Sequence, residues 1–388
     1  MDFSRTDGLA GYRVQARQWA AGQLREEWLA QEHETGTHHN PVLHRLLAEQ
    51  GILGAGWPKE YGGSDVDPGL ADAIIEEISR RGLRMDGWIT TWMVLHTIDE
   101  VGSEELKREV IPAALAGEAV IVLGYTEPGS GSDVAAAQTR AVPVDGGWSI
   151  DGSKMFTSTA HMATHVFLLT RTNTEVPKHR GLTLFLVPLD LPGIEIRPIY
   201  TLGGQRTNTT FYNDVVVPDS ARVGDVDAGW SVMRVALTFE RSVGETGFGP
   251  TFRRRLRDWY AAGDQERAAR GRSAGVRAFL ARTAIEDEVS RLMALRVDSI
   301  LARGGLPGVE SSMLKLFRTE TMQRQHAGLL DLLGAEAVLE GAGGPLNGEI
   351  EYAFRNSVLG TIAGGTSEIL REVVAERRLG LPRARPSG

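Results

Sequence analysis

Apolar residues recur at helical spacing over the first third of the chain. Between Tyr12 and about Ala116, segments such as "PVLHRLLAEQGILG" and "ADAIIEEISRRG" place apolar residues on one face of a helix. The segment "GSEELKREVIPAALAGE" has Ser103 as a candidate N-cap, acidic residues in the first turn and Gly117 as a stop signal. This third of the chain is predicted to be helical.

The pattern changes to strands in the middle of the chain and returns to helices afterwards. Between about Val120 and Gly224, short runs rich in Val, Thr, Phe and Leu alternate with Gly, Pro, Asn and Asp, as in "THVFLLTRT", "GLTLFLVPL", "GIEIRPI" and "NTTFYNDVVVP". From Asp227 helical periodicity continues to "TSEILREVVAERRLGLPR", where Thr366 or Ser367 can cap a final helix.

This order predicts an α+β protein with three domains. We expect an N-terminal helical domain over residues 1–118, a middle β-barrel-like domain over 119–225 and a C-terminal helical bundle over 226–388. A doubly wound fold is disfavoured, because its strands and helices alternate throughout.

Composition narrows the classes of function. The 388 residues carry a net charge of -8, which disfavours nucleic acid or an anionic membrane as a partner. The absence of cysteine excludes disulfides, thiolate metal sites and a cysteine nucleophile. The first 20 residues lack the pattern of a secretory signal, and no apolar run approaches the roughly 20 residues that span a bilayer, so a cytoplasmic protein is expected.

Two polar segments of the middle domain are candidates for ligand binding. "LGYTEPGSGSDV" (residues 123–134) holds three glycines and several hydroxyl groups, which let an anion or a ring approach the backbone closely. An ordinary glycine–serine connection is the alternative. In "GSKMFTSTAHMATHVFLLTRT", Phe156 precedes Thr157 and Ser158, a combination that suits stacking and hydrogen bonding to a planar heterocycle. Taken alone, Phe156 is better explained as a core residue.

These two segments resemble the acyl-CoA dehydrogenase family. Five further segments share the resemblance, namely "GWPKEYGG", "GSEELKREVIPAALAGE", "GGQRTNTTFYNDVVVP", "AFRNSVLGTIAGGTSEI" and "ERRLGLPR", so that it spans nearly the whole chain. Its most specific parts are "TEPGSGSDV" and "GGTSEI".

The resemblance implies a flavoprotein that binds FAD and oxidises an acyl-CoA to its trans-2-enoyl-CoA. It also implies a tetramer, either a homotetramer or a heterotetramer with a related subunit, and electron-transferring flavoprotein as the electron acceptor. By position in the family's motifs, the residues implied to bind FAD are Leu123, Tyr125, Thr126, Gly131, Ser132, Phe156, Thr157, Ser158, Gly334, Thr366 and Glu368. Those implied to contact the acyl-CoA are Ser132, Arg241 and Gly364.

The position of the catalytic base is the main question that the sequence raises. The reaction needs a base for the α-proton while a hydride leaves the β-carbon. Many family members carry that carboxylate where this chain has Gly364, whereas members that take branched or longer acyl chains carry it on an interior helix in an "ER" context. The apolar helix predicted over 227–247 carries Glu240 and Arg241 in that context, so Glu240 is the candidate base. A buried ion pair is the alternative role for Glu240.

Departures from the family leave other functions open. The family's Arg-Phe-Gly and downstream Gln, by which one subunit reaches its neighbour's FAD, are missing from the region of residues 260–296. The chain could therefore be the active partner in a mixed tetramer, such as relatives that act on steroid side chains form. A flavin monooxygenase is a further alternative, while a nitroalkane oxidase is disfavoured by Gly364. Trp88, Trp92 and His96 fall on one helix face, as acyl-cavity residues or as ordinary core.

Overall fold

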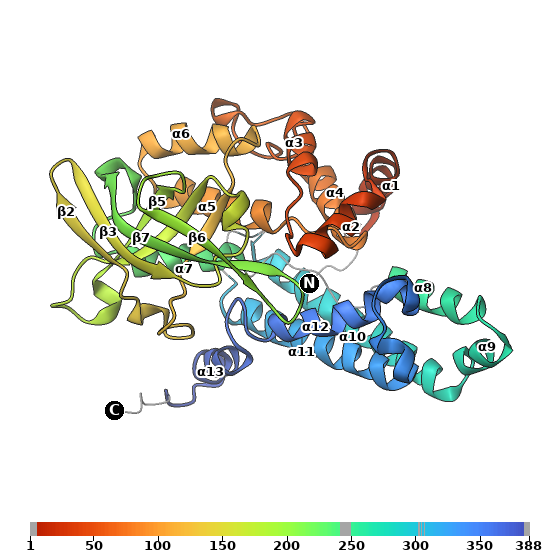
Figure 1. The fold of residues 1–388 in the computed structure, drawn as a ribbon. Coiled ribbons are helices and arrows are strands. Elements are labelled where there is room, and N and C mark those ends of the chain that lie inside the picture. The colour runs from red at the N-terminus through yellow and green to blue at the C-terminus, as the bar shows by residue number, and fades with distance from the viewer. Residues whose placement is uncertain (1–5, 241–249, 302, 304, 306, 384–388) are drawn as a thin grey trace. The chain divides into compact units, whose positions relative to one another are not determined.

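The chain forms two compact units. The computed structural model describes residues 6–240, 250–301, 303, 305 and 307–383. One unit runs from the N-terminal helices through the sheet to helix α7 (Gly229–Glu240), and the second contains the C-terminal helices together with Leu202–Gly204. Figure 1 shows the first unit in red to green and the helices of the second in cyan to blue.

Helices form the first third of the chain, as the apolar spacing predicts. Asn40 caps α3 by accepting hydrogen bonds from the amides of Val42 and Leu43, and Ser103 caps α6 by accepting one from Leu106 at 3.2 Å. The cap predicted at Ser103 is therefore confirmed. The helices are α1 (Thr6–Gln23), α2 (Glu26–Thr35), α3 (Pro41–Glu49), α4 (Pro68–Arg80), α5 (Asp86–Val101) and α6 (Glu104–Leu115).

The middle of the chain forms a mixed sheet of eight strands. Seven of them follow the order β6-β7-β3-β2-β4-β5-β8, and β1 pairs with β4 in parallel. The strands are β1 (Ile121–Gly124), β2 (Arg140–Val144), β3 (Gly147–Lys154), β4 (His165–Arg171), β5 (Leu182–Pro188), β6 (Ile194–Tyr200), β7 (Arg206–Pro218) and β8 (Arg222–Val223).

The centre of this sheet is buried on both faces. Phe167 and Leu169 of β4 belong to the apolar core that the N-terminal helices and α7 share, whereas Val166 and Leu168 belong to a second core on the opposite face. This alternation explains why β4 and β5 read as continuous apolar runs. Helices α5 and α7 pack against β1 and β5 respectively, and thus cover one face (Figure 1).

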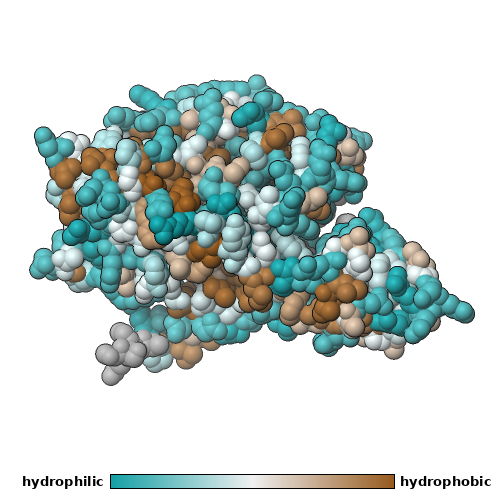
Figure 2. Space-filling view, viewed as in Figure 1, coloured by the Kyte–Doolittle hydropathy of each residue, from teal (hydrophilic) through white to brown (hydrophobic). Residues whose placement is uncertain are grey.

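One side of the sheet is partly apolar on its surface around β2, β3 and β7. Val142 and Val144 of β2 are each 40% exposed, and Val216 of β7 is 58% exposed. Val142 and Val216 both pair with Ser149 of β3, so they share one side of the sheet. Hydrophobic side chains gather over β2 and β3 in Figure 2.

The second unit is a helical bundle. Its apolar core includes Leu256, Val276, Leu329 and Ile350, which come from four different helices. Across the described parts of both units, we find no helix that is long and apolar enough to cross a membrane. The helices of this unit are α8 (Pro250–Ala261), α9 (Gln265–Gly271), α10 (Ala274–Leu301), α11 (Val309–Leu333), α12 (Glu349–Gly360) and α13 (Ser367–Arg377).

Candidate functional site

The glycine-rich loop that follows β1 folds back on itself. The amide of Glu127 donates to the carbonyl of Ser130 at 2.9 Å, and the amide of Ser130 donates to the carbonyl of Glu127 at 3.1 Å. Beyond this turn Gly131 and Ser132 are exposed. A methyl group placed on Gly131 would meet no atom within 4 Å. The loop therefore presents open backbone and hydroxyl groups, which a ligand can approach closely.

The turn after β3 lies beside this loop, because the amide of Met155 donates to the carbonyl of Thr126 at 2.8 Å. Phe156 in this turn has a φ of 58° and is 56% exposed, an unusual combination for a large apolar residue. The amide of Ser158 donates to the carbonyl of Phe156 at 2.9 Å and closes the turn. The interpretation of Phe156 as a core residue is therefore wrong.

The hydroxyl groups after Phe156 are anchored to β7. The Oγ1 atom of Thr157 lies 3.4 Å from that of Thr210, and the amide of Thr157 donates to the carbonyl of Asn208 at 2.9 Å. The Oγ atom of Ser158 lies 3.1 Å from Oγ1 of Thr207. Thr157 is fully buried while Ser158 is half-buried, so the second hydroxyl is the one that a ligand can reach.

Leu123 and Tyr125 extend the same site to the end of β1. Both are half-buried, and both pack against the core that the N-terminal helices share with the sheet. The ring of Tyr125 lies 6.2 Å from that of Phe167. The structure thus gathers on one unit the candidate residues Leu123, Tyr125, Thr126, Gly131, Ser132, Phe156, Thr157 and Ser158.

The candidate base is carried by helix α7, of which Glu240 is the last residue. The helix is buried on one side, where Val232, Met233 and Ala236 are at most 3% exposed. The side chain of Glu240 and the whole of Arg241 lie outside the described residues. Their predicted roles therefore stay predictions.

An aromatic cluster surrounds the end of α7. His96 of α5 stacks on Phe239 at 5.2 Å and on Trp57 at 4.6 Å between ring centroids, and Trp92 meets His96 edge-on at 4.4 Å. Burial lowers the pKa of His96 below its usual value, which favours the neutral imidazole. Trp88 is separate from this group and contacts His44. The aromatic stripe predicted on α5 therefore divides between two environments.

The last helix of the second unit begins as the sequence predicts. Thr366 is the N-cap of α13, and its hydroxyl accepts a hydrogen bond from the amide of Ile369 at 3.3 Å. Gly364 and Gly365 have φ values of 66° and 96°, and the ammonium of Lys315 donates to the carbonyl of Gly365 at 2.6 Å. Hydrogen bonds from its own amide and from Thr366 lower the pKa of the Glu368 carboxyl.

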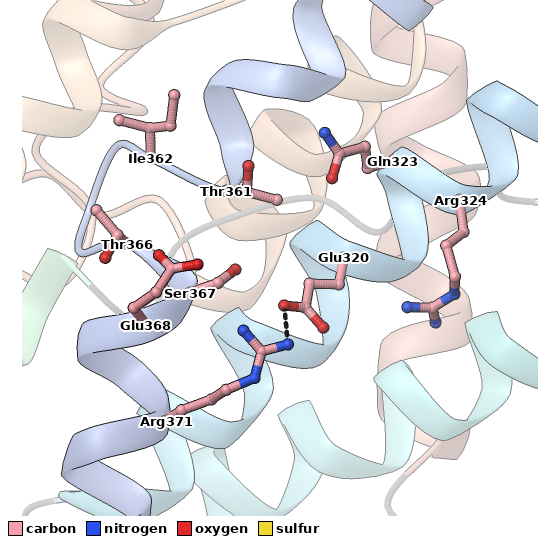
Figure 3. Close-up of a pocket in the computed structure, with 9 residues that line it drawn as sticks. All are labelled: Glu320, Gln323, Arg324, Thr361, Ile362, Thr366, Ser367, Glu368 and Arg371. Carbon is pink, nitrogen blue, oxygen red and sulfur yellow. Dashed lines mark hydrogen bonds and ion pairs between the residues drawn. The ribbon is translucent and has the colours of Figure 1, made fainter.

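A cavity of about 470 Å³ opens between α11 and the start of α13 (Figure 3). The ion pair between Arg371 and Glu320, at 2.5 Å, forms part of its wall. Ser367 is 4% exposed, and its Oγ has no hydrogen-bond partner among the residues that the structure describes. The lining residues are Glu320, Gln323, Arg324, Thr361, Ile362, Thr366, Ser367, Glu368 and Arg371.

Two predicted glycines do not line this cavity. Gly364 lies in the loop just before Thr366, and Gly334 lies at the end of α11 with a φ of 65°. The structure thus brings Thr366 and Glu368 together and leaves Gly334 apart from them.

Sequence reasoning missed several residues of these sites. Trp57 could have been found from its place in the "GWPKEYGG" motif. Lys154, which is buried two residues before Phe156, gave no signal in a strand of mixed polarity. The cavity residues Glu320 and Arg324 gave none either, because they become part of a site only where α11 meets α13. Over the described stretches of the chain, no group of three or more His, Asp and Glu residues could hold a metal ion.

Solved and curated proteins show extensive similarity to this chain. It is 35% identical over 340 residues to "Acyl-CoA dehydrogenase FadE34" of Mycobacterium tuberculosis, covering 87% of this chain but only 46% of that protein. The structure of the "Tcur3481-Tcur3483 steroid ACAD" superposes with a TM-score of 0.86 at 32% identity, covering 99% of this chain and 100% of the other. The "ChsE4-ChsE5 complex from Mycobacterium tuberculosis" gives a TM-score of 0.88 at 31% identity, covering 99% and 100%.

Family models account for nearly the whole chain. Those for the N-terminal, middle and C-terminal domains of acyl-CoA dehydrogenases match residues 9–118, 122–215 and 227–379, in the order that the fold shows. The helical first third, the central mixed sheet and the helical last third are the architecture of that family. The chain therefore belongs to the acyl-CoA dehydrogenase family, whose members are FAD-dependent oxidoreductases.

Proposed function

We propose that this chain catalyses the α,β-dehydrogenation of an acyl-CoA thioester to a trans-2-enoyl-CoA with FAD as its cofactor. The observation that carries the proposal is Phe156, a large aromatic residue that is 56% exposed and held at a positive φ beside a glycine-rich loop. A ring with this much exposed surface is not part of a packed core. It is suited to stack on a planar ligand.

The residues around Phe156 fit the chemistry of FAD. The half-buried hydroxyl of Ser158 can hydrogen-bond to a heterocycle, and the exposed Gly131 and Ser132 leave room for a diphosphate at the backbone. Ser130 Oγ is buried without a hydrogen-bond partner within the described part of the chain. FAD, when bound, supplies the acceptor for the hydride that leaves the β-carbon.

In the proposed reaction Glu240 removes the α-proton of the acyl thioester. Glu240 is the last residue of α7, whose buried side carries Val232, Met233 and Ala236. The amide of Gly364 is proposed to polarise the thioester carbonyl as negative charge develops, a role that needs no side chain. Arg241 and Ser132 are proposed to contact the substrate, and Thr366, Glu368 and Gly334 to contact FAD.

The test is a titration of the FAD-loaded protein with a panel of acyl-CoA esters while the flavin absorbance is followed. Wild type should lose its flavin absorbance with at least one ester. Glu240→Gln should retain FAD and lose this bleaching by a factor of at least ~100, which is the typical contribution of general-base catalysis. Glu100→Gln is the matched control, since Glu100 is exposed at the end of α5, and it should bleach like wild type.

Two results would contradict the proposal. Wild-type protein that binds FAD but bleaches with no ester in the panel would exclude the dehydrogenase activity for those substrates. Undiminished bleaching by Glu240→Gln would exclude Glu240 as the base and leave the activity itself in place.

A second candidate is that the chain works as one subunit of a mixed assembly that acts on a bulky, steroid-like acyl-CoA. Two similar solved structures are each named for two proteins together, Tcur3481-Tcur3483 and ChsE4-ChsE5, and the first is described as a steroid ACAD. The missing Arg-Phe-Gly and Gln pattern supports this candidate, because it removes contacts by which a copy of the same chain would complete the FAD site. Measuring FAD per chain after separate purification tests it, since a stoichiometric, stable flavoprotein would favour a homotetramer instead.

The electron acceptor is proposed to be electron-transferring flavoprotein, as the family resemblance implies. Reoxidation of the bleached enzyme by that protein, measured against reoxidation by oxygen alone, tests the proposal. Rapid reoxidation by oxygen would instead indicate an oxidase or a monooxygenase.

A further inference from the structure

A lysine is completely buried next to the turn that carries Phe156. Lys154 is the last residue of β3, and its exposed fraction is 0%. Lysine is among the residues that proteins bury least often, and full burial normally requires a charged partner. The proposed reaction gives Lys154 no chemical step, so its burial needs another explanation.

Glu127 of the glycine-rich loop is the partner of Lys154. The ammonium Nζ lies 2.8 Å from Oε1 of Glu127 and also donates to the carbonyl of Tyr125 at 3.3 Å. The carboxylate, which is 8% exposed, accepts two further hydrogen bonds from the amides of Gln138 and Thr139, at 2.7 and 2.8 Å. One ion pair thus joins the loop, the end of β3 and the segment that enters β2.

The electrostatic cost of burying this pair is offset by the number of its hydrogen bonds. Desolvation lowers the pKa of Lys154 to about 8, and the ammonium of Lys154 holds the pKa of Glu127 below its usual value. The guanidinium of Arg171 on β4 is the remaining charge that acts on Lys154. It donates to the carbonyls of Ala135 and Ala137, and so fixes the far end of the same loop.

We propose that Lys154 and Glu127 are positioning residues, which hold the loop 125–132 and the turn 155–158 in the arrangement that the FAD site requires. The inference rests on the proposed FAD-binding role of these two segments. Glu127 directly follows the candidate FAD contact Thr126, and Lys154 lies two residues before Phe156 and donates to the carbonyl of Tyr125.

The positive φ of Phe156 is a reason why this turn needs positioning residues. A non-glycine residue at φ 58° costs free energy and persists only when its surroundings fix it. The ring is exposed, so its own packing does not fix it. The backbone bond from Met155 to Thr126 and the ion pair one residue earlier are the contacts that attach this turn to the loop.

The chain offers a matched control on the same loop. Lys178 lies 2.5 Å from Asp133, and the two side chains are 49% and 55% exposed. An exposed pair of this kind contributes little to stability because solvent screens it. Lys178→Met therefore makes the same lysine-to-methionine change as Lys154→Met, but it removes an exposed ion pair of this loop instead of a buried one.

The experiment compares Lys154→Met, Glu127→Gln, the double variant and Lys178→Met with wild type. FAD affinity is measured by flavin fluorescence during titration of each apoprotein, and hydrogen exchange is measured over residues 123–139 and 155–158. Each single variant should bind FAD at least ~10-fold more weakly, because removing one partner leaves a buried charge uncompensated. Exchange should rise in those two segments, and Lys178→Met should match wild type in both measurements.

The pH dependence of FAD affinity in the two single variants distinguishes an electrostatic role of the ion pair from a role in packing alone. In Lys154→Met, protonation of the buried Glu127 relieves the unpaired carboxylate, so FAD affinity should partly recover as the pH falls. In Glu127→Gln, deprotonation of Lys154 relieves the unpaired ammonium, so affinity should partly recover as the pH rises. Arg171 stays charged throughout this range, so it adds no pH dependence of its own.

The results that overturn the proposal are distinct from those that overturn the dehydrogenase activity. Unchanged FAD affinity and hydrogen exchange in both single variants would exclude a positioning role for the Lys154–Glu127 ion pair. Affinity losses with the same pH dependence in both variants would exclude it too. If a single variant fails to fold, the double variant decides, since it leaves no unpaired charge and should recover FAD binding. No acyl-CoA is used, so a wild type that binds FAD without any bleaching leaves this test valid.

Discussion

His44 provides a test of how burial acts on stability in the N-terminal helices. Its side chain is 2% exposed, and neither Nδ1 nor Nε2 has a hydrogen-bond partner among the residues of the described structure. Its ring lies against those of His39, at 4.9 Å, and Trp88, at 5.9 Å. Desolvation and the nearby His39 lower the pKa of His44 to about 3.

The sign and size of the effect follow from linkage. In the unfolded chain the imidazole has a pKa near 6.5, so the unfolded state binds the proton below that pH while the folded state does not until about pH 3. The contribution of His44 to the free energy of unfolding is fully present above about pH 6.5 and is lost as the pH falls. Between pH 7 and pH 5 the free energy of unfolding should drop by about 2 kcal/mol on account of His44.

The assay is urea unfolding at pH 7 and pH 5, followed by circular dichroism, for wild type and His44→Phe. Phenylalanine keeps a ring in this site and removes the titration, so the variant should lose about 2 kcal/mol less than wild type between the two pH values. His33→Phe is the control, because His33 is exposed on the preceding helix α2. Equal losses in wild type and His44→Phe would refute the reasoning, since burial would then carry no penalty for the protonated imidazole.

Three further changes test other parts of the structure. Phe156→Ala should leave the melting temperature of the apoprotein unchanged and weaken FAD binding about fivefold, because a stacked ring contributes about 1 kcal/mol. Fluorescence titration with FAD measures the change in affinity. Thr366→Ala removes the N-cap of α13 and should destabilise that helix by about 1 kcal/mol, which faster hydrogen exchange at Ser367 to Ile369 would reveal. Arg371→Gln should change the melting temperature by less than about 2 °C, since its pair with Glu320 is partly exposed and contributes under about 1 kcal/mol.

The order of helices, strands and helices could be predicted from the sequence because periodicity is a local property. Ser103 and Thr366 cap the helices that the pattern assigns to them, since a cap needs only a hydroxyl and the next three residues. The apolar runs in the middle of the chain predicted strands, and β4 and β5 form there. The family motifs likewise named the segments around Thr126 and Phe156.

What the sequence could not decide is how each side chain is used. Phe156 could be a core residue or an exposed ring, and only its φ and exposure distinguish the two. Lys154 and Glu127 lie 27 residues apart, and only the pairing of the folded segments makes them a buried ion pair. The sequence determined the elements, because local spacing and capping act within a few residues. The tertiary structure decided burial and charge partners, because both depend on which distant segments exclude water together.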